Sequence, residues 1–273
     1  MSRGELTDAQ WERLAGLLPP QQPARGRPNK DHREVLNGIL WVLRTGAPWR
    51  DVPREQFGSW KTLSSRFYRW QEAGIWARVL RQLQAEAHED GHLDWALHFM
   101  DASVIRAHQH AAGARGTPSK GGKLKRLAAA RGGFSTKLHV RAEGEGRPLV
   151  FALTAGQRHE TQAFEALMTG GSVPRAHSPG APRRLPDALV GDKGYSYNTL
   201  RVWCREHGVQ AIIPTRSNQP RQRTFRRAAY RKRCRVECLF NRLKQNRRVA
   251  TRYEKRAANY LAMVHIASIR LWL

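Results

Sequence analysis

The stretch Tyr230–Lys244, Y-R-K-R-C-R-V-E-C-L-F-N-R-L-K, places one carboxylate inside a dense run of basic residues. It contains neither Pro nor Gly, and its apolar residues recur with the period of a helix that packs one face on a core. Tyr230, Arg233, Glu237 and Lys244 fall within one arc about 60° wide beside that apolar face. A carboxylate flanked by two basic side chains and a phenol favours binding of a metal ion that is itself bound to a phosphate. The carboxylate would bind the metal ion, and the basic side chains would bind the phosphate oxygens.

An amphipathic helix with a solvated charged stripe would show the same pattern. The surrounding charge favours the functional interpretation. Residues 221–256 carry fifteen Lys or Arg against two acids, which is half of the chain's net charge of +26. Charge of this density repels itself unless a polyanion neutralises it, so nucleic acid is the first expected partner. An anionic membrane surface and simple supercharging are weaker alternatives. Arg248 and Arg252 of this stretch are predicted DNA contacts.

Composition limits the remaining choices. A chain of 273 residues, 40% hydrophobic with nine Trp, suits one large or two modest domains with a substantial core. Three Cys and no charged-then-apolar leader predict a reducing, cytoplasmic environment. The absence of an 18-residue apolar run predicts no membrane span. Cys234 and Cys238 are spaced like a ligand pair, but with a single other Cys we interpret them as ordinary helix residues and not as a zinc site.

Residues 1–91 are predicted to form a helical DNA-binding domain. Thr7 and Gln10 have the spacing of a capping box for a short first helix. A turn and then a helix over 60–70 resemble a helix-turn-helix, with Lys61, Arg66 and Arg69 opposite the apolar anchors. A plain three-helix packing unit gives the same pattern, so the basic context is what favours DNA. Further helices are predicted over 33–43 and 75–88.

Residues 92–273 are predicted to form an α/β domain with a mixed sheet flanked by helices. Period-two alternation predicts a strand that ends in Asp101, and a hairpin follows over 133–140 and 149–153. The short apolar strand 188–190 delivers Asp192 and begins a strand-helix-strand unit. Basic loops are expected at 108–133 and 215–227, and the last helix at 257–272. The first of these loops would serve as a phosphate-binding arm or be disordered.

Three carboxylates stand out in this second domain. Asp101 and Asp192 are expected at strand ends and Glu237 on a helix, and an acid in such a place is costly unless something pairs with it. Convergence of all three would hold two divalent cations about 3.5 to 4 Å apart, which activate a water or 3′-hydroxyl and stabilise the leaving oxygen of a phosphodiester. Oxygen ligands favour Mg²⁺, two per site, with Mn²⁺ able to substitute.

These residues carry a resemblance to bacterial insertion-sequence transposases of the DDE class. The signature Tyr-x2-Arg-x3-Glu-x6-Lys is complete as Tyr230, Arg233, Glu237 and Lys244. The second-acid motif of the family is similar to Asp192-Lys193-Gly194-Tyr195, and the first to Met100-Asp101-Ala102-Ser103. The likeness extends over nearly the whole chain, including Gly132–Lys137 and Gly156–Glu160. Glu160 could be mistaken for the second acid, but Asp192 has the better setting, at a strand end with a glycine turn after it.

The resemblance implies an RNase H-like catalytic domain after a helical DNA-binding region. It implies metal binding by Asp101, Asp192 and Glu237, and DNA contacts from Tyr230, Arg233 and Lys244. The expected reaction is cleavage at terminal inverted repeats and joining of 3′-hydroxyls to target DNA. The expected assembly is a homodimer on paired ends, associated with the bacterial nucleoid through DNA. A nuclease of the same fold without strand transfer and a non-catalytic DNA-binding regulator remain alternatives.

Overall fold

The computed structural model of the chain describes residues 4–22, 28–112, 128–130, 133–176, 180–220, 222 and 224–273. The N-terminal part is helical, with α1 (Asp8–Ala15), α2 (His32–Thr45), η1 (Trp49–Asp51), α3 (Arg54–Phe57), α4 (Trp60–Glu72) and α5 (Ile75–Glu89). The remainder alternates strands and helices: β1 (Leu97–Ala107), α6 (Gln109–Ala112), β2 (Ala128–Ala130), β3 (Gly133–Ala142), β4 (Pro148–Ala155), η2 (Glu160–Ala163), α7 (Phe164–Gly170), β5 (Ala188–Val190), η3 (Lys193–Tyr195), α8 (Asn198–Glu206), β6 (Gln210–Ile212), α9 (Arg227–Arg231), α10 (Cys234–Lys244), α11 (Arg247–Ala250), β7 (Thr251–Arg252) and α12 (Ala257–Trp272).

Local sequence signals place the N-terminal helices. The predicted capping box is present at α1, where the Thr7 hydroxyl accepts from Gln10 N and the Gln10 side chain accepts from Thr7 N. Helix α2 ends at Gly46 in the left-handed conformation, with φ of 76°. The expected turn between α2 and α4 is longer than predicted, because α3 follows the 3-10 turn η1. Among the described helices, none has the length and apolar character that crossing a membrane requires.

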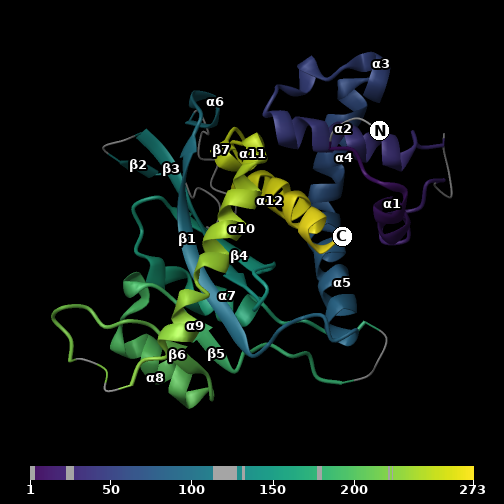
Figure 1. The fold of residues 1–273 in the computed structure, drawn as a ribbon. Coiled ribbons are helices and arrows are strands. Elements are labelled where there is room, and N and C mark those ends of the chain that lie inside the picture. The colour runs from purple at the N-terminus through teal and green to yellow at the C-terminus, as the bar shows by residue number, and fades with distance from the viewer. Residues whose placement is uncertain are drawn as a thin grey trace.

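The sheet is mixed, as predicted. Strands β1, β3 and β4 form an antiparallel meander, while β5 runs parallel to β1 and β6 parallel to β5. The path β2-β3-β1-β5-β6, with β4 also paired to β3, makes β1 a central strand. This order, with helices on both faces, is the RNase H-like arrangement that the resemblance implied, and Figure 1 shows α10 lying along β1.

The two faces of β1 bury different cores, because alternate side chains of a strand point to opposite faces. Phe99 joins the larger core, which includes α10, α12 and the N-terminal helices. Met100 joins a second core with α7 and α8. The larger core continues without interruption from the N-terminal helices into α12, which packs against α5. A domain boundary at residue 91 therefore stays a prediction.

Three elements differ from the sequence prediction. Strand β1 does not end at Asp101 but continues to Ala107, because β3 pairs with it as far as Arg106 and β7 pairs with its last two residues. The predicted helix over Tyr230–Lys244 is divided into α9 and α10 by a turn at Lys232 and Arg233. The predicted loop 108–133 contains α6 and β2; residues 113–127 and 131–132 lie outside the described residues.

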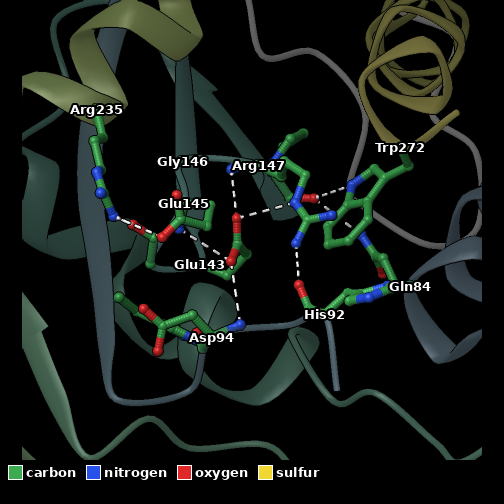
Figure 2. Close-up of polar contacts among 12 residues, drawn as sticks. Gln84, His92, Asp94, Glu143, Glu145, Gly146, Arg147, Arg235 and Trp272 are labelled. Atoms are coloured by element: carbon green, nitrogen blue, oxygen red, sulfur yellow. Dashed lines mark hydrogen bonds and ion pairs between the residues drawn. The ribbon is translucent and has the colours of Figure 1, made fainter. Parts of the chain in front are cut away.

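A polar network ties α10 to the turn between β3 and β4 (Figure 2). Glu143 is fully buried, and its carboxylate accepts hydrogen bonds from the backbone N–H groups of Asp94, Glu145 and Arg147 and from Arg147 Nε. Arg235 of α10 donates to Gly144 O and pairs with Glu145. The turn that Glu143 organises thus holds two side chains of α10, those of Arg235 and Arg242.

Replacing Glu143 with Ala should lower the free energy of unfolding by about 3 kcal/mol, because the donors it satisfies would be left buried without an acceptor. Glu145→Ala is the matched control: its side chain is 61% exposed, so its pair with Arg235 should be worth less than about 1 kcal/mol. Urea unfolding followed by tryptophan fluorescence measures both values. Equal losses in the two variants would contradict the structural role of Glu143.

Candidate active site

The first two predicted acids meet because their strands are parallel neighbours. Phe99 of β1 pairs with Val190 of β5. Asp101 and Asp192 each lie two residues beyond this pair, so both lie at the carboxyl end of the short strand β5. Asp192 accepts a hydrogen bond from Gly194 N at 2.8 Å, which closes the turn that begins η3. The prediction that these two carboxylates lie close together is supported by this register.

The third acid reaches the same place from α10. Arg233, the residue before α10, donates from Nη1 to Asp101 Oδ2 at 3.2 Å and from Nη2 to Glu237 Oε1. One guanidinium group therefore bridges an acid on the central strand and an acid on the helix. The Asp101 side chain is 14% exposed, whereas that of Glu237 is 52% exposed. The site is thus buried at the sheet and open to solvent at the helix.

Burial of Asp101 without a full countercharge has an electrostatic consequence. Desolvation raises the pKa of Asp101 to about 6, although the hydrogen bond from Ala102 N and the charge of Arg233 act in the opposite direction. The carboxylates of Asp192 and Glu160 add to the rise. A pKa raised by burial within a group of acids is typical of functional sites.

The donor set fits a divalent cation. All three predicted ligands are carboxylates, which are the ligands of Mg²⁺ and Mn²⁺. In the part of the chain that the structure describes, no three acidic, His or Cys side chains are close enough together to hold a metal ion as they stand. Arg233 supplies the positive charge between Asp101 and Glu237 instead.

Of the two remaining signature residues, Lys244 contacts β1 on the face that carries Asp101, and Tyr230 packs on Phe225. Lys244 Nζ donates to Ser103 Oγ at 2.7 Å, two residues beyond Asp101 on the same strand face. Tyr230 of α9 is half-buried, and its ring packs 5.3 Å from that of Phe225. Because the turn at Lys232 and Arg233 separates Tyr230 from α10, the predicted single arc of four residues along one helix stays a prediction.

Two predicted DNA contacts of the C-terminal region are corrected by their burial. Arg248 is 6% exposed, pairs with Glu254 at 2.9 Å and donates to Ala47 O. Arg252 is fully buried and donates to Thr136 Oγ1 and to the carbonyl groups of Glu254 and Lys255. Both guanidinium groups hold the protein together and do not face solvent in this structure.

Arg66 of α4 is corrected for the same reason. It is 4% exposed, its Nη1 lies 2.8 Å from His32 Nδ1, and its Nη2 donates to Asn29 Oδ1. The other two predicted residues of this helix, Lys61 and Arg69, are exposed and border a surface hollow together with Ser65. Since these three are spaced by four residues, α4 presents one basic stripe to solvent.

The double variant Lys61→Ala/Arg69→Ala removes this basic stripe and should weaken DNA binding. The slope of the logarithm of the binding constant against the logarithm of salt concentration should become smaller in magnitude by about 2, because two phosphate contacts are lost. Fluorescence anisotropy between low and moderate salt measures the slope. Arg78→Ala, an exposed basic residue of α5, is the control. A slope unchanged in the double variant would exclude the stripe from the DNA interface.

Two neighbours of the acidic site, Glu160 and Lys137, were not among the predicted ligands. Glu160 pairs with Lys137 Nζ at 3.6 Å, and both side chains are largely buried. The sequence contained a signal for Glu160, because it follows a strand within the Gly156–Glu160 stretch, but Asp192 was preferred. Nothing in the spacing of Lys137 indicated this contact.

Comparisons with known proteins identify two families along the chain. Residues 6–80 match the family described as "Putative transposase of IS4/5 family". Residues 97–272, more than half of the chain, match the family described as "Transposase DDE domain". The second range contains Asp101, Asp192 and Glu237.

Individual relatives have related descriptions. The chain is 29% identical over 144 residues to the putative transposase for insertion sequence element IS6501 of Brucella ovis, covering 51% of this chain and 99% of that protein. It is 38% identical over 112 residues to an uncharacterized 16.2 kDa protein of insertion element IS402 of Burkholderia cepacia, covering 39% and 76%. The solved Mos1 transposase paired-end complex with left transposon end is 9% identical and covers 84% of this chain and 82% of that one, with a TM-score of 0.25.

Proposed function

Because the chain belongs to the family of transposases with a DDE domain, we propose that it binds the terminal inverted repeats of an insertion sequence, cleaves the ends of the element and joins the freed 3′-hydroxyls to target DNA. The observation that supports this proposal is the Asp101–Arg233–Glu237 bridge beside Asp192. An acid on the central strand, an acid directly after the neighbouring strand β5 and an acid on α10 are held there at the carboxyl end of β5.

The three carboxylates would hold the metal ions. Bound divalent cations supply Lewis-acid activation of the attacking water or hydroxyl and stabilisation of the leaving oxygen. The central strand positions Asp101. Asp192 is positioned by the turn that follows it, where its Oδ1 accepts a hydrogen bond from Gly194 N. Glu237 is positioned by α10, which Arg235 and Arg242 fasten to the β3–β4 turn.

The basic members of the signature would hold the DNA. Arg233 is paired with two carboxylates, and the same guanidinium fork matches a phosphate group. With a cation held by Asp101 and Glu237, the Arg233 guanidinium would be available to bind the phosphodiester backbone beside the cut. Tyr230 of α9 and Lys244 of α10 lie before and after Arg233 in the chain and would contact the same stretch of DNA. Two ends must be held in one complex for joining, so we also propose that the protein acts as a homodimer.

A magnesium-dependence assay tests the proposed function. Purified protein is incubated with a labelled duplex that carries the element's own terminal repeat and with a plasmid target, beside the Asp192→Asn variant. Magnesium-dependent cleavage and transfer of the label to the plasmid, both lost in the variant, are expected. Cleavage without transfer would indicate a nuclease, and DNA binding without either reaction would indicate a regulator.

A further inference from the structure

Glu160 approaches Asp101 and Asp192 from the face of the sheet opposite to the face that Glu237 covers. Its partner Lys137 pairs with Val104 in the β1–β3 ladder, so the Lys137 side chain points away from the face that carries Asp101. Glu160 begins η2, directly before α7, which packs on β4 and β3. Acidic side chains therefore border the carboxyl end of β5, beside the middle of β1, from both faces of the sheet.

Glu160 and Asp192 converge on one glycine. A methyl group added at Gly194 would overlap Glu160 Oε2 and would lie 2.8 Å from Asp192 Oδ1. Both oxygens consequently lie on the same side of Gly194 and within a few ångströms of one another. Two oxygens that bind one Mg²⁺ at about 2.1 Å are separated by about 3 to 4 Å, so a small side-chain rotation would let one cation bind both.

A buried hydroxyl group beside these acids has no partner. Tyr195 is fully buried, and among the described residues no group forms a hydrogen bond with its OH. Burial raises the pKa of Tyr195, and the negative charges of Glu160, Asp101 and Asp192 raise it further. A buried polar group without a partner is costly unless a further ligand or water completes it.

We propose that Glu160 is a fourth acidic residue of the active site, which binds a divalent cation together with Asp192, while Lys137 provides the countercharge when no cation is bound. This inference rests on the proposed function, because the cation is the one that DNA cleavage requires. It assigns Glu160 to the face of the sheet opposite to Glu237, where the DDE signature assigns no ligand.

The arrangement of charges on the two faces supports the assignment. On one face Arg233 neutralises Asp101 and Glu237, and on the other Lys137 neutralises Glu160 beside Asp192. Carboxylates this close repel one another unless a positive charge intervenes. Each face thus has acidic side chains and one basic side chain that a bound cation would displace.

Manganese binding by the full chain, measured by isothermal titration calorimetry without DNA, tests the proposal. Glu160→Gln should weaken Mn²⁺ binding about tenfold, because one ligand loses its charge. Lys137→Gln should strengthen it several-fold, because a competing positive charge is removed. Glu165→Gln, an exposed acid of α7, should leave it unchanged. Opposite effects of the first two variants would not arise if the ion pair were only structural.

Equal Mn²⁺ affinity in wild type and Glu160→Gln would overturn the proposal, as would equal weakening in Glu160→Gln and Lys137→Gln. Thermal melting of each variant confirms that it is folded. The DNA cleavage assay is scored separately. If the wild type cleaves DNA and its Mn²⁺ affinity does not depend on Glu160, the proposed function stands and the fourth acid is excluded. If the wild type does not cleave DNA, the proposed function itself is contradicted.

Discussion

Glu237→Gln should lower the rate of DNA cleavage about a thousandfold, which corresponds to about 4 kcal/mol of transition-state stabilisation. The substitution keeps the size of the side chain and removes the charge that would hold a cation opposite Asp101. Since Glu237 is half exposed and not part of the core, the fold should be unaffected. Binding of the terminal-repeat duplex should stay within about threefold of wild type, because one negative charge near the DNA is removed and no basic contact is lost.

The control for this variant is Asn241→Ala, an exposed residue one turn further along α10. It should cleave at the wild-type rate. Cleavage by single-turnover gel assay and binding by anisotropy are measured on the same preparations. Full cleavage by Glu237→Gln would exclude Glu237 from the chemistry, and a parallel loss of binding would indicate that the helix and not the charge had been disturbed.

The sequence predicted most of what local chemistry controls. The cap at Thr7, the meander of β1, β3 and β4, and the short strand before Asp192 depend on residues close together in the chain. The family signature also indicated Arg233 and Glu237, which do contact one another. These features are predictable because spacing along a helix or strand fixes which side chains share a face.

The features that were missed depend on contacts distant in the sequence. Strand β1 continues past Asp101 because β3 and Thr251–Arg252 pair with it, and no local signal indicates the second of these partners. The charge count marked Arg248 as a DNA contact, but it could not show that Glu254 and the Ala47 carbonyl would enclose that side chain. Similarly, the proximity of Glu160 to Asp192 arises from the packing of η2 against η3.

Asp101→Asn should make the metal-free protein more stable at neutral pH while it abolishes cleavage. The pKa of Asp101 is raised from 3.8 to about 6 by burial. Between these two values the folded protein binds the proton more tightly than the unfolded chain, so stability falls as pH rises through this range. Above pH 6 the full cost is present, about 3 kcal/mol at 1.36 kcal/mol per pKa unit. Asn removes the charge and hence this cost.

Urea unfolding in the presence of a chelator at several pH values between 5 and 8 measures the difference. The difference in free energy of unfolding between Asp101→Asn and wild type should be largest at pH 7 to 8 and shrink towards pH 5. It should vanish near the pKa that Asp101 has in the unfolded chain. In excess Mn²⁺ the order should reverse, because the wild type gains binding free energy that the variant lacks. A variant less stable than wild type at pH 7.5 without metal would contradict the raised pKa. The charged Asp101 side chain lowers the stability of the metal-free protein, and a bound cation would offset this loss. Such a residue is expected where selection acts on function and not on stability.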